Sequence, residues 1–119
     1  MNAAAPSPTV TLCPAGDLPP GAVRVAEITP PIAVFNVDGV LYAIDDTCSH
    51  AQASLADGDV DGCHVECPFH ASAFDLRTGE PDGLPASLPV RTHAVEVRDG
   101  MVVVLVGVSP AGRAGEPGT

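Results

Sequence analysis

Three Asp-Gly pairs, each between two strand-like runs, constrain the fold of this chain most strongly. They are Asp38-Gly39, Asp61-Gly62 and Asp99-Gly100, and the residues on either side of each pair are rich in β-branched or other apolar types. Asp-Gly is a strong signal for a two-residue hairpin turn, because both residues readily adopt the positive φ angles that such a turn needs. The sequence therefore predicts three antiparallel hairpins.

The apolar runs beside these turns indicate where the strands lie. The first hairpin is predicted to join residues 32–37 to 40–45, and the last to join 90–98 to 101–106. Further strands are expected at 9–12 and 22–28. Glycine or proline interrupts nearly every longer window, so no segment shows a helical period. We predict an all-β fold, a small antiparallel sandwich or barrel.

Length and composition favour a single domain. The chain has 119 residues, enough for one core of ordinary size. Its hydrophobic fraction is 45% but its aromatic fraction only 3%, so aliphatic side chains must fill that core. We expect the domain to span 9–108. The flanking segments 1–8 and 109–119 have little to bury and are expected to be disordered tails.

Net charge and the distribution of apolar residues indicate which partners and which location to expect for this chain. Fifteen acidic residues against five basic ones give a net charge of -10, which argues against binding to nucleic acid or to an anionic membrane. No apolar run approaches the roughly 20 residues that span a bilayer, and the start lacks a secretory signal. We expect a cytoplasmic protein. In that reducing compartment its four cysteines are better read as metal ligands than as disulfides.

Two short boxes combine cysteine with histidine: Cys48-Ser49-His50 and Cys67-Pro68-Phe69-His70. Each box follows a predicted strand, so both can lie in loops at one end of a sheet. Two thiolates suit a ferric ion bridged by sulfide, and two imidazoles suit a second iron. The alternative is a structural zinc site made of the same four residues, although common zinc modules pair cysteine with cysteine and histidine with histidine.

Residues 47–79, which include both boxes, resemble the cluster-binding part of Rieske proteins. The likeness is greatest to the soluble Rieske ferredoxins of bacterial aromatic-ring-hydroxylating dioxygenase systems. It implies a Rieske-like fold whose cluster-binding subdomain, about 46–89, has two ligand loops and a proline-bearing loop, 81–89. It also implies one 2Fe-2S cluster per chain, with one iron bound by Cys48 and Cys67 and the other by His50 and His70.

Four positions near the boxes can be compared with the respiratory branch of the family, and three of them have a different residue here. Ala53 and Phe69 occupy the positions of two cysteines that form a disulfide in that branch. Ser72 matches a serine whose hydroxyl donates to a cluster sulfur there, although it can also be read as a turn residue. Phe74 replaces a tyrosine donor, which implies a lower reduction potential. Phe69 and Phe74 are expected to shield the cluster from water.

The resemblance implies an electron carrier, and no catalytic residue set contradicts it. The chain is expected to pass electrons, as a monomer, from an NADH-dependent flavoprotein ferredoxin reductase to a terminal non-haem iron oxygenase in aromatic hydrocarbon catabolism. Four acidic residues near the boxes are expected to steer a basic partner: Asp45, Asp46, Asp57 and Asp59. The alternative is a small redox subunit of a nitrite reductase or another oxidoreductase.

The remaining cysteines and histidines receive no role in this interpretation. Cys63 and His64 lie between the boxes and are expected to be structural. Cys13 lies near the start of the domain. His93 is expected on the polar face of the first strand of the last hairpin.

Overall fold

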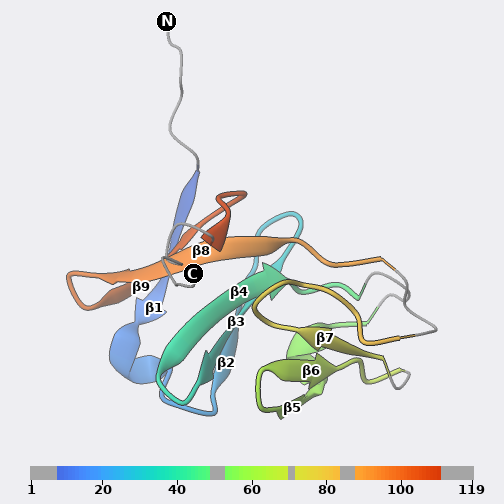
Figure 1. The fold of residues 1–119 in the computed structure, drawn as a ribbon. Coiled ribbons are helices and arrows are strands. Elements are labelled where there is room, and N and C mark those ends of the chain that lie inside the picture. Colours follow the sequence, from blue (N-terminus) through green and yellow to red (C-terminus); the bar gives the residue numbers. More distant parts are fainter. Residues whose placement is uncertain (1–7, 49–52, 70–71, 84–87, 111–119) are drawn as a thin grey trace, which may run out of the picture.

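The computed structural model describes residues 8–48, 53–69, 72–83 and 88–110, which form an almost entirely β structure (Figure 1). Every strand pairing is antiparallel, so the predicted fold class is confirmed. In order across the six-stranded sheet, the strands are β1 (Thr9–Pro14), β9 (Met101–Leu105), β8 (Thr92–Arg98), β4 (Val40–Asp45), β3 (Ile32–Val37) and β2 (Val23–Ala26). The three-stranded sheet contains β5 (Asp59–Asp61), β6 (His64–Glu66) and β7 (Ala73–Asp75).

The helical elements of the described residues are two short 3₁₀ turns, η1 (Ala15–Asp17) and η2 (Leu55–Asp57). Among the described residues, none of the helices has the length and apolar character needed to cross a membrane. The predicted tails fall almost wholly outside the described residues.

The first and last hairpins have the turns that their Asp-Gly pairs predict. Val37 pairs with Val40 across the first turn, so β3 and β4 have the predicted bounds. Asp38 and Gly39 have φ angles of 53° and 92°, and the corresponding pair in the β8–β9 hairpin has 51° and 79°. Two successive positive φ angles are typical of a type I′ turn, whose twist matches that of the strands.

The middle hairpin is present, but its turn lies one residue later than predicted. Asp61 belongs to β5 and pairs with His64, so Gly62 and Cys63 form the turn. Of these two residues only Gly62 has a positive φ angle, 60°, as in a type II′ turn. The shift moves the polar residues of β5 and β6 onto one shared face.

The small sheet is an insertion between two neighbouring strands of the large sheet. The chain leaves at the end of β4, forms β5, β6 and β7, and returns to pair β8 with β4. Figure 1 shows the small sheet beside the part of the large sheet that contains β2, β3 and β4. Strand β7 was not predicted, because three residues are too few to show an alternating pattern.

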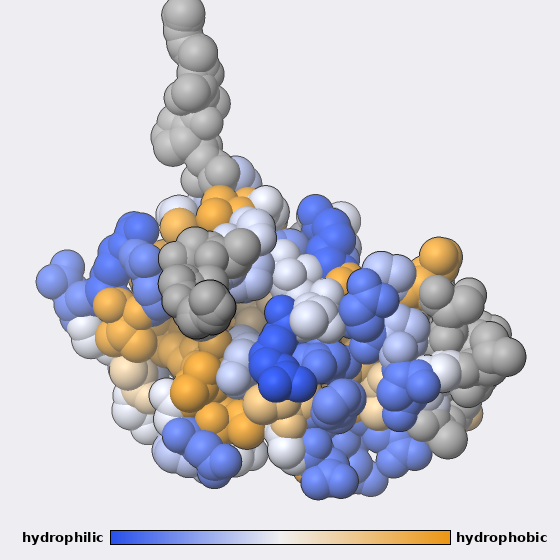
Figure 2. All heavy atoms as spheres, viewed as in Figure 1, coloured by the Kyte–Doolittle hydropathy of each residue, from blue (hydrophilic) through white to orange (hydrophobic). Residues whose placement is uncertain are grey.

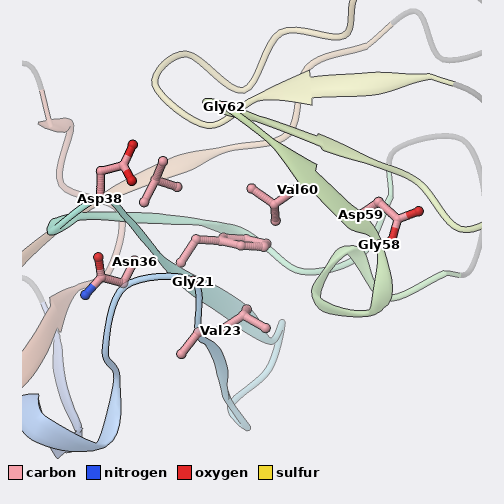
Figure 3. A pocket seen from close by; sticks show the side chains of 11 residues that line it. Gly21, Val23, Asn36, Asp38, Gly58, Asp59, Val60 and Gly62 are labelled. Carbon is pink, nitrogen blue, oxygen red and sulfur yellow. The ribbon is translucent and has the colours of Figure 1, made fainter.

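An apolar cluster between the two sheets holds the small sheet in place. The large sheet contributes Phe35 and Ile44, and the small sheet contributes Val65 and Phe74. Beside this cluster a hollow of about 410 Å³ remains between the sheets, and Val23 and Val60 reach toward it from opposite sides (Figure 3). A second cluster, built from Leu18, Ile32, Val34, Val102, Val104 and their neighbours, forms the core of the large sheet.

The face assignment predicted for β8 is wrong at His93. This residue is buried rather than on the polar face, and Val97 on the same strand is 52% exposed. Residues two apart in a strand share a face, so His93 faces the same way as Val95 and Val97 and opposite to Glu96 and Arg98. The face is buried at the start of the strand and reaches solvent toward its end.

A tight turn after β7 returns the chain toward the large sheet. The backbone N–H groups of Thr78 and Gly79 both donate to the carbonyl oxygen of Asp75. Arg77 donates to the Asp75 carboxylate from its backbone and its guanidinium, and this pairing holds the pKa of Asp75 below its ordinary value. Beyond the turn, Val90 N–H donates to Gly79 O at 2.9 Å, just before β8 begins.

Replacing Gly79 by alanine should destabilise the protein. The φ angle of Gly79 is +80°, and an added Cβ would lie 2.0 Å from Val90 O. Left-handed backbone strain and this contact together should reduce the free energy of unfolding by about 2 kcal/mol or more. For a domain of this size we expect the thermal midpoint to fall by about 10 °C.

Gly16→Ala is the matched control, because a Cβ at Gly16 would meet no atom within 4 Å. Circular dichroism melts of both variants beside the parent chain make the measurement. Equal thermal midpoints for the two variants would show that stability does not depend on the close approach of Gly79 to Val90 O.

Candidate metal centre

The first cysteine-histidine box lies in a loop closed by the backbone. Just beyond β4, Thr47 forms an isolated antiparallel bridge with Ser54. Inside this bridge, Cys48 N–H donates to Ala53 O at 2.9 Å. The loop 48–53 therefore begins at a buried cysteine and closes five residues later.

The second box lies in a loop with the same closure. Glu66 of β6 pairs with Ala73 of β7, and inside this pair Cys67 N–H donates to Ser72 O at 2.9 Å. The loop 67–72 thus has the same length and the same closing hydrogen bond as the first loop. In each of them the cysteine comes first and a histidine follows within the loop.

The two loop cysteines are buried in the same apolar cluster. Cys48 is 4% exposed and Cys67 is 2% exposed, and both pack with Leu55 and Phe74 in the cluster between the sheets. Two thiols that enter one water-excluding cluster from separate loops match the thiolate half of the predicted ligand set. The other two predicted ligands, His50 and His70, lie outside the described residues.

A buried carboxylate stabilises the base of the first loop. Asp46 Oδ1 accepts hydrogen bonds from Ser54 Oγ and from Ala56 N–H, each at 2.9 Å. Leu55 N–H also donates to the Asp46 carbonyl oxygen. The expectation that Asp46 steers a partner is therefore wrong, because its side chain is buried and bonded within the loop base. A sequence pattern cannot distinguish such a carboxylate from a surface one.

Ser72 connects the second loop to the segment that precedes residues 84–87. Its hydroxyl is buried and donates to Gly83 O at 2.9 Å. Beside it, Asp82 N–H donates to Ala73 O and Asp82 Oδ1 accepts from Ala73 N–H. The serine thus joins two segments of the cluster-binding region.

The two phenylalanines near the second box have opposite environments. Phe74 is fully buried beside both loop cysteines. Phe69, one residue before His70, instead projects into solvent and is 70% exposed. Only Phe74 is placed to exclude water from the cysteines in the isolated chain.

Comparison with known protein families decides the class of this site. The family model described as the Rieske [2Fe-2S] domain matches residues 9–94, which include both loops and most of the large sheet. The chain is a member of the Rieske family. Its cofactor is accordingly a Rieske 2Fe-2S cluster, and the buried thiols of Cys48 and Cys67 fit that group.

Individual Rieske relatives are ferredoxins. The 3-phenylpropionate/cinnamic acid dioxygenase ferredoxin subunit of Photorhabdus laumondii is 45% identical over 80% of this chain and 91% of its own length. The complex of reduced oxygenase and oxidised ferredoxin in carbazole 1,9a-dioxygenase contains a chain with a TM-score of 0.78 and 40% identity, covering 85% of this chain and 94% of that one. The ferredoxin of carbazole 1,9a-dioxygenase from Nocardioides aromaticivorans has a TM-score of 0.76 and 35% identity, covering 82% and 97%.

The chemistry available to this Rieske protein is one-electron transfer. When bound, the cluster would supply a reversible one-electron couple. The apolar residues packed around Cys48 and Cys67 exclude water from the two thiols. Like these ferredoxin relatives, the chain is an electron-transfer protein and not itself an oxygenase.

The cysteines and histidines outside the boxes occupy other environments in this Rieske domain. Cys13 is buried in the core of the large sheet. Cys63 Sγ lies 3.8 Å from the Tyr42 hydroxyl, and His64 Nε2 lies 3.8 Å from Asp75 Oδ2. Within the ranges that the structure describes, no three His, Cys, Asp or Glu side chains group closely enough to hold a metal ion.

Removing the Asp46 carboxylate should loosen the loop that contains the first cysteine-histidine box. Hydrogen bonds to a charged acceptor contribute about 1.5–3 kcal/mol each, so Asp46→Ala should reduce stability by at least about 2 kcal/mol. We expect a lower thermal midpoint and less iron per chain after purification. Asp57→Ala is the matched control, because Asp57 is an exposed carboxylate a few residues away. Full iron content and an unchanged midpoint in Asp46→Ala would contradict this role.

Proposed function

We propose that Cys48 and Cys67 bind one iron of the Rieske cluster and that His50 and His70 bind the other, within a domain that spans 9–108. The observation that supports this assignment is that the two loops have the same length and are closed by the same kind of backbone hydrogen bond. Each loop starts with a cysteine buried in the same apolar cluster and contains a histidine downstream. A loop pair of this kind supplies the two thiolates and two imidazoles of a Rieske centre.

Substitution of each proposed ligand should abolish the cluster. Cys48→Ser, Cys67→Ser, His50→Ala and His70→Ala should each lose the visible absorption, and their iron should fall from about two ions per chain toward zero. Iron and acid-labile sulfide analysis makes the measurement.

Cys63→Ser and His64→Ala are the controls, because these residues lie between the boxes and are outside the proposed ligand set. They should keep both iron and colour. A control that loses its cluster as completely as the four ligand variants would refute the assignment.

We further propose that the chain carries electrons from an NADH-dependent flavoprotein reductase to a terminal ring-hydroxylating oxygenase. The support comes from relatives that are ferredoxin subunits of aromatic dioxygenases, and from the carbazole dioxygenase structure, in which a similar ferredoxin is bound to its oxygenase. The proposal assigns the chain a monomeric state and a cytoplasmic location, where NADH is available to a reductase.

Two exposed apolar side chains, one of them in the second loop, support an oxygenase docking site. Phe69 and Leu88 are 70% and 65% exposed, although large apolar side chains usually lie inside a domain. Next to Phe69 is a hollow of about 360 Å³ whose lining includes the acidic residues Asp57, Asp59 and Glu66. Figure 2 shows that hydrophilic residues cover most of the small-sheet side of the molecule in this view. Such a surface fits a partner that presents apolar and basic groups together.

A reconstituted system tests the electron path. Reductase, oxygenase, NADH and the aromatic substrate are mixed with or without the purified chain, and hydroxylated product is measured. We expect product formation to depend on the chain, and undiminished product without it would refute the proposed path.

Phe69→Ser tests the docking surface in the same assay. Loss of a central apolar contact should raise by about 5- to 30-fold the ferredoxin concentration needed for half-maximal turnover. Val97→Ser is the matched control, since Val97 is also an exposed apolar residue but lies near the far end of β8. An equal effect of the two substitutions would argue against docking at Phe69.

A further inference from the structure

His93 has no place in the function described so far, yet it is a buried histidine whose two ring nitrogens both have partners. Its side chain is fully shielded from solvent, and its Nε2 lies 2.8 Å from Asp45 Oδ1. On the other side of the ring, Gly107 N–H donates to Nδ1 at 2.9 Å. The imidazole therefore bridges the segment after β9 to the end of β4.

These contacts determine which nitrogen carries the proton. A backbone N–H can only donate, so Nδ1 must be the acceptor in the bond from Gly107. The proton of the neutral ring is then on Nε2, which donates it to Asp45. Hence His93 acts as a directed donor to one carboxylate.

Asp45 also receives a second donor. Arg91 Nε lies 3.0 Å from Asp45 Oδ2, and Arg91 Nη2 lies 3.3 Å from Oδ1. The backbone adds a further link, because Asp45 N–H donates to Arg91 O at 2.9 Å. The carboxylate is thus held between His93 on its buried side and Arg91 on its exposed side.

This network lies at the junction from which the cluster-binding region emerges. The ladder between β4 and β8 contains only two residue pairs, Ala43 with His93 and Ile44 with Thr92. Asp45 is the last residue of β4, and the first ligand loop begins three residues later at Cys48. Arg91 directly precedes β8, where the chain returns from the segment after residues 84–87.

We propose that His93 is a positioning residue for the Rieske cluster, acting through Asp45. It holds the carboxylate in its ion pair with Arg91, keeps the two ends of the cluster-binding region together, and compensates a negative charge that lies three residues before the proposed ligand Cys48. This inference rests on the proposed ligand set.

The charge of Asp45 gives the inference a measurable consequence. A negative charge near the cluster opposes the uptake of an electron, and each donor to that charge reduces the opposition. Loss of the His93 donor or of the Arg91 cation should therefore lower the midpoint potential. A residue that only filled space would not produce this shift.

Two amide substitutions separate the donor role from packing. His93→Asn places an oxygen near the Nδ1 position, where it can accept from Gly107, but it does not reach Asp45. His93→Gln places an amide N–H near the Nε2 position, where it can donate to Asp45. The backbone N–H of Gly107 then loses its acceptor but is exposed and can donate to water. Redox titrations of the loaded protein at low salt should give a lower potential for the asparagine variant and a potential close to that of the parent for the glutamine variant. Cluster loss, followed by the decay of visible absorption, should be several-fold faster in the asparagine variant alone.

A pair of arginine substitutions tests the charge directly. Arg91→Gln removes a cation that pairs with Asp45, whereas Arg98→Gln makes the same change at the other end of β8, about 20 Å further along the strand. The first variant should lower the potential and the second should leave it unchanged. Both side chains are half-exposed, so neither change threatens the core.

The outcomes distinguish this inference from the function on which it rests. A parent chain that binds no cluster would overturn the ligand set and the inference with it. If the parent chain binds the cluster and His93→Asn has the same midpoint potential as the parent, the positioning role alone would be overturned. Failure of His93→Gln to restore the potential, or an equal shift in the two arginine variants, would also overturn it.

Discussion

Burial of Val65 and Phe74 against Phe35 and Ile44 is the interaction on which the rest of the structure depends. The loops that contain the two cysteine-histidine boxes belong to different strand systems, one after β4 and the other between β6 and β7. Only the packing of the small sheet on the large one brings Cys48 and Cys67 into one apolar cluster. Because the same contact excludes water, it both positions the thiols and sets the low polarity of their surroundings.

Acidic side chains serve two purposes in this chain. Asp45 and Asp46 are consecutive, but their carboxylates bond in different directions, one to His93 and Arg91 and the other to the base of the first loop. Asp57 and Asp59 are exposed instead and contribute to the negative surface beside Phe69. The exposed carboxylates thus contribute to the surface charge, whereas the internal carboxylates act through specific hydrogen bonds.

Much of the fold could be predicted from local signals. The bounds of β3 and β4 follow from an Asp-Gly turn between two apolar runs, and positive φ angles at Asp38 and Gly39 are what that turn requires. The sequence does not predict strand β7, because the strand is short and forms only by pairing with β6. The buried face of His93 follows from strand alternation alone, since His93 shares one side of β8 with Val95 and Val97.

The amino-acid sequence by itself determined the hairpins, the all-β class and the two cysteine-histidine boxes, because each depends on residues adjacent or nearly adjacent in the chain. Only the tertiary structure decided that Asp46 is internal, that Ser72 bonds to Gly83, and that His93 donates to Asp45. These contacts join segments whose approach depends on sheet packing and on register. A hydrogen-bond partner many residues away leaves no local pattern, so these pairings are visible only in three dimensions.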